Sequence, residues 1–86
     1  MTNAGYTIIK REFYNKEYCI VLGEKKCYNG EHCYGTQYVT WDCKPSENHY
    51  YWGHYHTHYY DALRDYHLRL IYYYNEKCTY YLNETI

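Results

Sequence analysis

The chain has 86 residues, and its nine Lys and Arg against ten Asp and Glu give a net charge near zero. A chain of this length builds one core and buries only somewhat over about 60% of its unfolded surface, which excludes large two-lobed enzymes. The charge balance argues against strong binding of duplex nucleic acid, which needs a basic stripe, and against a DNA mimic, which is acidic. We therefore expect one domain over residues 1–86.

Tyrosine is the unusual feature of the composition, with 17 Tyr beside one Phe and two Trp. A Tyr ring buries a large apolar area, but its hydroxyl needs a hydrogen-bond partner or water, so half-buried positions suit it best. An AT-rich genome is one explanation of the bias. A binding interface is the other, because exposed Tyr supplies contact area at small entropic cost. Both explanations predict aromatic rings at the surface.

The first part of the chain predicts two strands and a polar insertion. Residues 6–14 mix apolar and charged side chains in the manner of an edge strand with one solvated face. After a turn at Asn15-Lys16, residues 18–22 form a second, more buried strand. Residues 24–34 are polar and lack a helical period, so they form either a long loop or a small accessory hairpin.

Residues 36–43 alternate between two faces, with Val39, Trp41 and Cys43 expected in the core and Tyr38, Thr40 and Asp42 on the opposite face. Pro45 marks the next turn. Residues 50–56 predict another aromatic strand, in which Gly53 leaves room for a neighbouring ring or a bulge.

A helix is predicted over about residues 58–74, with Thr57 as its N-cap. Its apolar stripe has helical spacing and consists of Tyr59, Leu63, Tyr66, Leu70 and Tyr73, with Ala62 beside it. The remaining tail, 75–86, includes a short strand at 78–82. The predicted fold class is α+β: an antiparallel meander of four to five strands, over about residues 6–56, packed against one long C-terminal helix.

Five cysteines, an odd number, and an N-terminus without an apolar secretion signal predict a cytoplasmic protein with reduced thiols. One disulfide beside free thiols is the alternative. No apolar run approaches 18 residues, so we expect no membrane span and no membrane partner.

Alternating histidines suggest one metal hypothesis. On a continuous strand His54, His56 and His58 share a face at a spacing of about 6.6 Å. Two His at that spacing can bind one transition metal, with Asp61 or a cysteine to complete the shell. If the helix begins at Thr57, however, the alternation ends before His58 and the histidines are ordinary surface residues. His54 and His56 are thus the candidate metal ligands.

A second metal hypothesis uses soft ligands in the polar segment, namely Cys27, His32, Cys33 and Cys43. Their spacing lacks the C-x-x-C pair of most zinc sites, and free buried thiols are the alternative. No nucleophile-base pattern, phosphate loop or paired carboxylate motif is present. The sequence predicts neither an enzyme nor a bound cofactor.

Residues 38–69 resemble small uncharacterised ββ(ββ)α proteins that phages and mobile elements of clostridia and related Firmicutes carry. The resemblance rests on two aromatic strand segments and the helix opening, which read Tyr38-Val39-Thr40-Trp41, Tyr50-Tyr51-Trp52-Gly53-His54-Tyr55, and Ala62, Asp65, Tyr66 and Arg69. The chain departs from that pattern at His56 and His58, and segment 24–35 resembles an insertion. The resemblance implies an origin and no catalytic residues.

Small phage proteins often bind and disable a host defence component, as anti-CRISPR proteins and cyclic-nucleotide sponges do. We therefore expect an inhibitory protein that contacts a host defence protein, such as a CRISPR effector. A nucleotide-sequestering module and a small metal-stabilised domain are the alternatives. A homodimer through the edge strand 6–14 is a further expectation.

Aromatic and basic residues of the second half form the predicted binding surface: Tyr50, Tyr51, Trp52, Tyr55, Tyr59, Tyr60, Arg64 and Arg69. Further rings on the helix are Tyr72, Tyr73 and Tyr74. In the nucleotide alternative these rings stack on a base, while Arg64, Arg69 or Lys10 meets phosphate.

Overall fold

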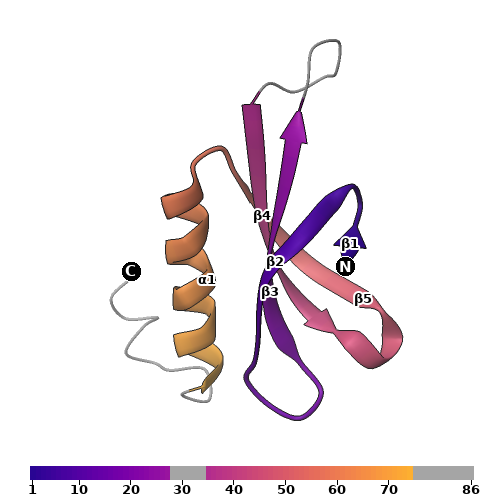
Figure 1. The fold of residues 1–86 in the computed structure, drawn as a ribbon. Coiled ribbons are helices and arrows are strands. Elements are labelled where there is room, and N and C mark those ends of the chain that lie inside the picture. The colour runs from indigo at the N-terminus through magenta and orange to yellow at the C-terminus, as the bar shows by residue number, and fades with distance from the viewer. Residues whose placement is uncertain (28–34, 75–86) are drawn as a thin grey trace.

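The computed structural model of the chain, which describes residues 1–27 and 35–74, is an α+β fold with one five-stranded sheet and one C-terminal helix (Figure 1). Strand order follows the chain and each neighbouring pair is antiparallel, so the predicted meander and helix are confirmed. The elements are β1 (Thr2–Asn3), β2 (Tyr6–Phe13), β3 (Cys19–Cys27), β4 (Gly35–Lys44), β5 (His49–His56) and α1 (Tyr59–Tyr74). Within the described residues, no helix is long and apolar enough to cross a membrane.

Two features of the sheet differ from the sequence prediction: the length of β3 and the position of β2. Strand β3 continues through residues 24–27, which pair with 35–38 of β4, so the hairpin alternative is correct for this part of the insertion. Strand β2 is not the outermost strand, because β1 pairs with Tyr6 and Thr7. Residues 28–34 and the tail 75–86, including the strand predicted at 78–82, lie outside the described residues.

One face of the sheet is covered by the curl of the sheet itself. Its core contains Cys19, Val21, Val39, Trp41 and Cys43. Both edges of the sheet approach each other over this core (Figure 1). The rings of Tyr6 in β2 and Tyr55 in β5 lie 6.3 Å apart, and the Tyr50 hydroxyl is 3.7 Å from the sulfur of Met1.

The other face is covered by α1, through Ile20, Leu22, Ala62, Tyr66 and Leu70. Partly buried residues of the same cluster include Tyr59, Leu63 and Tyr73, so the predicted helical stripe is confirmed. The predicted N-cap is wrong, because α1 begins at Tyr59. The first helical bond runs from the Ala62 N–H to the His58 carbonyl, which places His58 at the cap position.

Strand β4 is buried on both faces. Val39, Trp41 and Cys43 enter the core predicted for them. Opposite them, Thr40 is fully buried and Asp42 is only 3% exposed. Burial of a polar side chain is costly unless it is hydrogen-bonded. Both residues have partners: the Thr40 hydroxyl donates to Asp65 of α1, and the Tyr14 hydroxyl donates to Asp42 at 2.8 Å.

Strand β5 contains an irregularity where it passes Trp41. The pairing register shifts between Thr40 and Asp42, and Trp52 has a φ of 49°, in the left-handed region that non-glycine residues rarely adopt. At Gly53 an added Cβ would lie 2.8 Å from the indole nitrogen of Trp41. The prediction of a bulge or a close ring at Gly53 is therefore confirmed in both respects.

Gly53→Ala is expected to lower the free energy of unfolding by about 1–3 kcal/mol, the usual cost of overpacking a core. The buried Trp41 ring cannot move away without displacing the curled face of the sheet. Urea denaturation of both proteins measures the difference. Equal stability of variant and parent would contradict the close approach of Trp41 to this backbone.

Candidate binding cleft

A cleft of about 530 Å³ opens between the C-terminal half of α1, the turn that joins β2 to β3, and strands β4 and β5. We call it the aromatic cleft, because six of the described residues that line it are aromatic. They are Tyr14, Tyr18, Tyr51, Trp52, Tyr72 and Tyr73, with Asp42 as the only charged residue.

A tight turn between β2 and β3 positions one wall of the aromatic cleft. The Asn15 side chain accepts hydrogen bonds from the backbone N–H groups of Glu17 and Tyr18, each at 2.8 Å. This Asx turn brings Tyr14 and Tyr18 side by side, with ring centroids 6.2 Å apart and 19° between their planes. Tyr14 also stacks on Tyr73 of α1 at 4.4 Å, so the helix joins this wall.

Asp42 anchors the phenol rings at the base of the aromatic cleft. Burial, together with hydrogen bonding to the Asp42 carboxylate, raises the pKa of Tyr14 and of Tyr73 well above the ordinary value for tyrosine. Both phenols therefore stay protonated, and the Tyr14 hydroxyl donates to Asp42 at 2.8 Å with the Tyr73 phenol beside it. No Lys, Arg or His in the described ranges forms an ion pair with this carboxylate.

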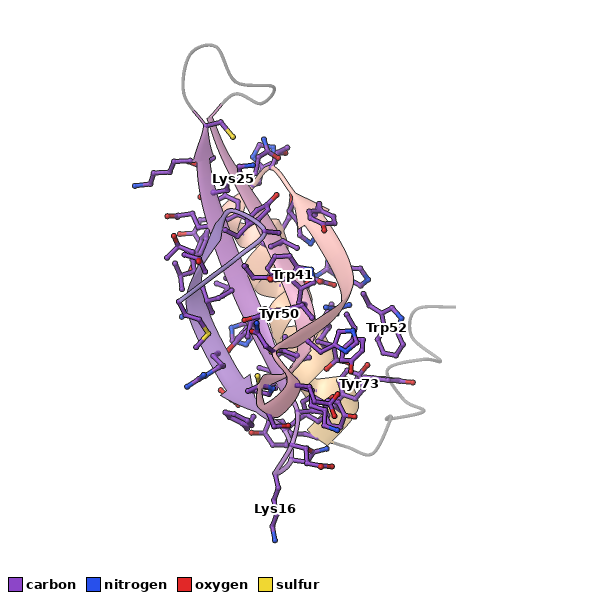
Figure 2. The ribbon with its side chains drawn as sticks, turned by 90° about the vertical axis from the view of Figure 1, so that its right-hand side faces the viewer. Lys16, Lys25, Trp41, Tyr50, Trp52 and Tyr73 are labelled. Carbon is purple, nitrogen blue, oxygen red and sulfur yellow. The ribbon has the colours of Figure 1, made fainter. Side chains whose placement is uncertain are left out.

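Trp52 forms the outer wall and is 70% exposed. In Figure 2 it stands away from the ribbon at the side of the molecule, with Tyr73 close by, whereas Trp41 and Tyr50 lie over the sheet. Arg69 of α1 is largely buried and donates a hydrogen bond to the Trp52 carbonyl. This bond holds the unusual backbone of Trp52, and such conformations cluster at functional sites.

Beside the aromatic cleft, Asp65 of α1 is surrounded by groups from β4 and β5. Its Oδ2 accepts from Thr40 and lies 2.9 Å from His54 Nδ1, 3.7 Å from His56 Nε2 and 4.0 Å from Arg69 Nε. Burial alone would raise the pKa of Asp65. Hydrogen bonds from Thr40 and His54, and the charges of His54 and Arg69, outweigh burial and lower this pKa below its usual value.

The metal hypotheses gain no support from this geometry. His54 and His56 both approach Asp65, and β5 ends before His58, as the alternative reading required. Among residues 1–27 and 35–74, no group of three or more His, Cys, Asp or Glu side chains is arranged to hold a metal ion.

The predicted grouping of Cys27 with Cys43 is wrong. Cys43 pairs with Cys19, eight residues before Cys27 in β3, so the two cysteines lie about 26 Å apart along the strands. Cys19 and Cys43 are buried free thiols, and burial raises the pKa of Cys19 to about 12. Cys27 is disulfide-bonded, which agrees with the alternative of one disulfide beside free thiols. His32 and Cys33 lie outside the described residues.

The eight residues of the predicted binding surface do not lie together in the structure. Of the eight, only Tyr51 and Trp52 line the aromatic cleft, and Arg69 contacts it through a hydrogen bond to the Trp52 carbonyl. Three of the others pack on rings elsewhere: Tyr50 on Trp41, Tyr55 near Tyr6, and Tyr59 on Tyr38. Tyr60 is exposed in the first turn of α1. Arg64 lines a small separate hollow with His56 and Asp61.

Sequence reasoning missed Tyr14, Tyr18 and Asp42 as parts of one site. The alternation of β4 correctly placed Asp42 opposite Trp41, but no local pattern indicated that Tyr14 would reach it from 28 residues away. The available signal for this site was the acidic residue Asp42 in a strand predicted to face a helix that has Tyr73 in its last turn.

No protein-family model matches the chain, and neither curated proteins nor solved structures give a match. The function is therefore inferred from the site itself.

Tyr14→Phe is expected to lower the free energy of unfolding by about 1.5–3 kcal/mol, because it removes a hydrogen bond to a buried carboxylate. Tyr18→Phe is the matched control, since its hydroxyl has no such bond to Asp42, and should change stability by less than about 0.5 kcal/mol. Equal effects of the two variants in urea denaturation would contradict the anchoring role of Asp42.

Asp65→Asn is expected to destabilise the fold by about 1–3 kcal/mol at pH 7. Because the pKa of Asp65 is lower in the folded state, the ionised carboxylate contributes stability above the unfolded pKa of about 3.9, and the contribution is lost as pH falls through the folded pKa. The difference from the parent protein should therefore shrink below about pH 4.

Urea denaturation at pH 7 and pH 3 measures both effects of this change. Asp61→Asn, at an exposed position in the same helix, is the control and should cost less than about 1 kcal/mol at either pH. A constant Asp65→Asn difference at both pH values would show that the ionised form of Asp65 is not what stabilises the fold.

Proposed function

We propose that the chain is an inhibitory binding protein, of phage or mobile-element type, that blocks a host defence component such as a CRISPR effector by direct protein contact. In this proposal the aromatic cleft and its rim are the contact surface, the chain performs no catalytic step, and it acts in the host cytoplasm. The exposed Trp52 at the mouth of the cleft is the observation that carries the proposal.

Trp52 has the properties of an interface anchor. Its indole is 70% exposed, although Trp is usually mostly buried, and the backbone beneath it is held by Arg69. Trp and Tyr are the residues most enriched among those that dominate binding energy. The hydrogen bond from Arg69 orders the backbone of Trp52 in advance, so less of the chain has to be ordered when a partner covers the ring.

The nucleotide-sequestering alternative has less support. It requires a cation beside the stacked rings that is free to meet a phosphate. No Lys or Arg is among the described residues that line the aromatic cleft, and Lys44, whose ammonium group lies 5.7 Å from the Tyr18 ring centroid, is paired with Glu47 at 2.9 Å. Arg64 lies in the separate hollow, Lys10 lines another hollow with Met1 and Ile8, and Arg69 is turned toward Trp52 and Asp65.

Trp52→Ala is expected to abolish inhibition while the protein stays folded. In a bacterial strain with active CRISPR interference, expression of the parent chain should restore plaque formation by a targeted phage. Trp52→Ala should restore little, because loss of an interface anchor weakens binding by roughly 30-fold or more. The purified effector and calorimetry give the affinity directly.

Tyr60→Ala is the matched control, since Tyr60 is also a highly exposed aromatic residue but lies at the opposite end of α1. It should inhibit as the parent does. Undiminished interference in the presence of the parent chain, with no effector binding by calorimetry, would remove CRISPR effectors as the partner. Equal activity of Trp52→Ala and the parent would remove the aromatic cleft as the contact surface.

A further inference from the structure

The rings of the aromatic cleft differ in which of their faces are free. Tyr14 and Tyr73 stack on each other at 4.4 Å, so these faces are occupied. Among the rings of the described residues, Trp52 contacts only Tyr51, in a tilted arrangement at 6.1 Å and 46°. With 70% of its surface exposed, Trp52 offers an open π face to an incoming group. Trp provides the strongest cation–π attraction of the aromatic side chains.

The charge of the aromatic cleft also favours a cation as the group that enters it. Asp42 is the only charged group among the described lining residues, and it is 3% exposed. Its described partner is a neutral phenol, that of Tyr14, at 2.8 Å, with the Tyr73 phenol beside it. A buried carboxylate without a basic partner is costly, and an entering cation would supply the missing countercharge.

The rim already holds one cation in this manner. The ammonium group of Lys44 lies 5.7 Å from the ring centroid of Tyr18 and also pairs with Glu47 at 2.9 Å. The combination of an aromatic face and a nearby carboxylate therefore holds a lysine at the edge of the cleft. Trp52 and Asp42 bring an aromatic face and a carboxylate to the cleft itself, where no Lys or Arg is among the described lining residues.

We propose that the aromatic cleft receives a cationic side chain of the partner protein, a lysine ammonium group, between its aromatic walls and with Asp42 as countercharge. This inference rests on the proposed function and specifies what the partner inserts. An anion is disfavoured by Asp42, and a neutral apolar group would leave the carboxylate uncompensated. The partner surface should therefore present a protruding lysine.

Matched pairs of small probes test the inference. Nα-acetyl-lysine methylamide and Nα-acetyl-norleucine methylamide have side chains of similar shape, but only the first is charged. Each is titrated into the protein while the indole N–H signals are followed by NMR, with Trp52→Phe identifying the Trp52 signal. The lysine probe should shift this signal and bind at least roughly fivefold more tightly than the norleucine probe.

Two variants check the roles of ring and carboxylate. Asp42→Asn should reduce the preference for the lysine probe to about twofold or less. If this variant does not fold, Trp52→Leu serves instead, because Trp52 is exposed; the binding is then followed by calorimetry and the preference should again disappear. Tyr60→Ala should retain the full preference. Equal binding of the two probes to the parent, or no binding of either, overturns the inference.

A second probe pair separates a partner side chain from a free small cation. Choline and its neutral analogue 3,3-dimethylbutan-1-ol are titrated in the same way. If choline binds more than roughly tenfold tighter than the lysine probe, the cleft is a site for a small quaternary ammonium compound and the lysine assignment is overturned. Comparable affinities support the lysine.

The probe experiments can fail independently of the proposed function, and the proposed function can fail independently of them. Inhibition of an effector that depends on Trp52, together with equal binding of the charged and neutral probes, overturns only the lysine inference. Preferential binding of the lysine probe without any inhibition supports the inference and overturns the CRISPR effector as partner.

Discussion

The burial of two polar residues on β4 determines how the helix sits on the sheet. Thr40 and Asp42 alternate with the core residues of the opposite face, so they must lie under α1. A buried hydroxyl or carboxylate without a partner costs more than a hydrogen bond returns, so partners at defined positions are required. Asp65 near the middle of α1 and Tyr73 in its last turn provide them. Together they fix the register of the helix along β4.

The same constraint explains why tyrosine, and not phenylalanine, surrounds this end of the sheet. The Tyr14 ring packs against Tyr73 while its hydroxyl reaches Asp42, so one side chain satisfies both the apolar contact and the carboxylate. The bulge at Trp52 then aims a large ring outward next to this polar base. An aromatic wall with a carboxylate beneath it is thus a consequence of how the sheet and the helix are joined.

The sequence predicted the features that have a local period. The two-residue alternation of 36–43 and the helical stripe from Tyr59 to Tyr73 are both present, because each reports burial of one face of a single element. The continuation of β3 through 24–27 was left open, since its polar residues depend on pairing with β4. The cleft was only partly predicted, because its rings come from separate elements. Strict alternation along β5 would place Tyr50 and Trp52 on the same side, whereas the bulge at Trp52 puts its ring in the cleft and leaves Tyr50 against Trp41.

A double-mutant cycle between Tyr73→Phe on the helix and Asp42→Asn on the sheet measures the contact on which this arrangement depends. Free energies of unfolding of the parent, the two single variants and the double variant give the coupling between the two side chains. We expect a coupling of about 1–3 kcal/mol, as for residues that share a buried hydrogen bond. Additive effects, within about 0.5 kcal/mol, would contradict the role of Asp42 in joining helix, sheet and aromatic cleft.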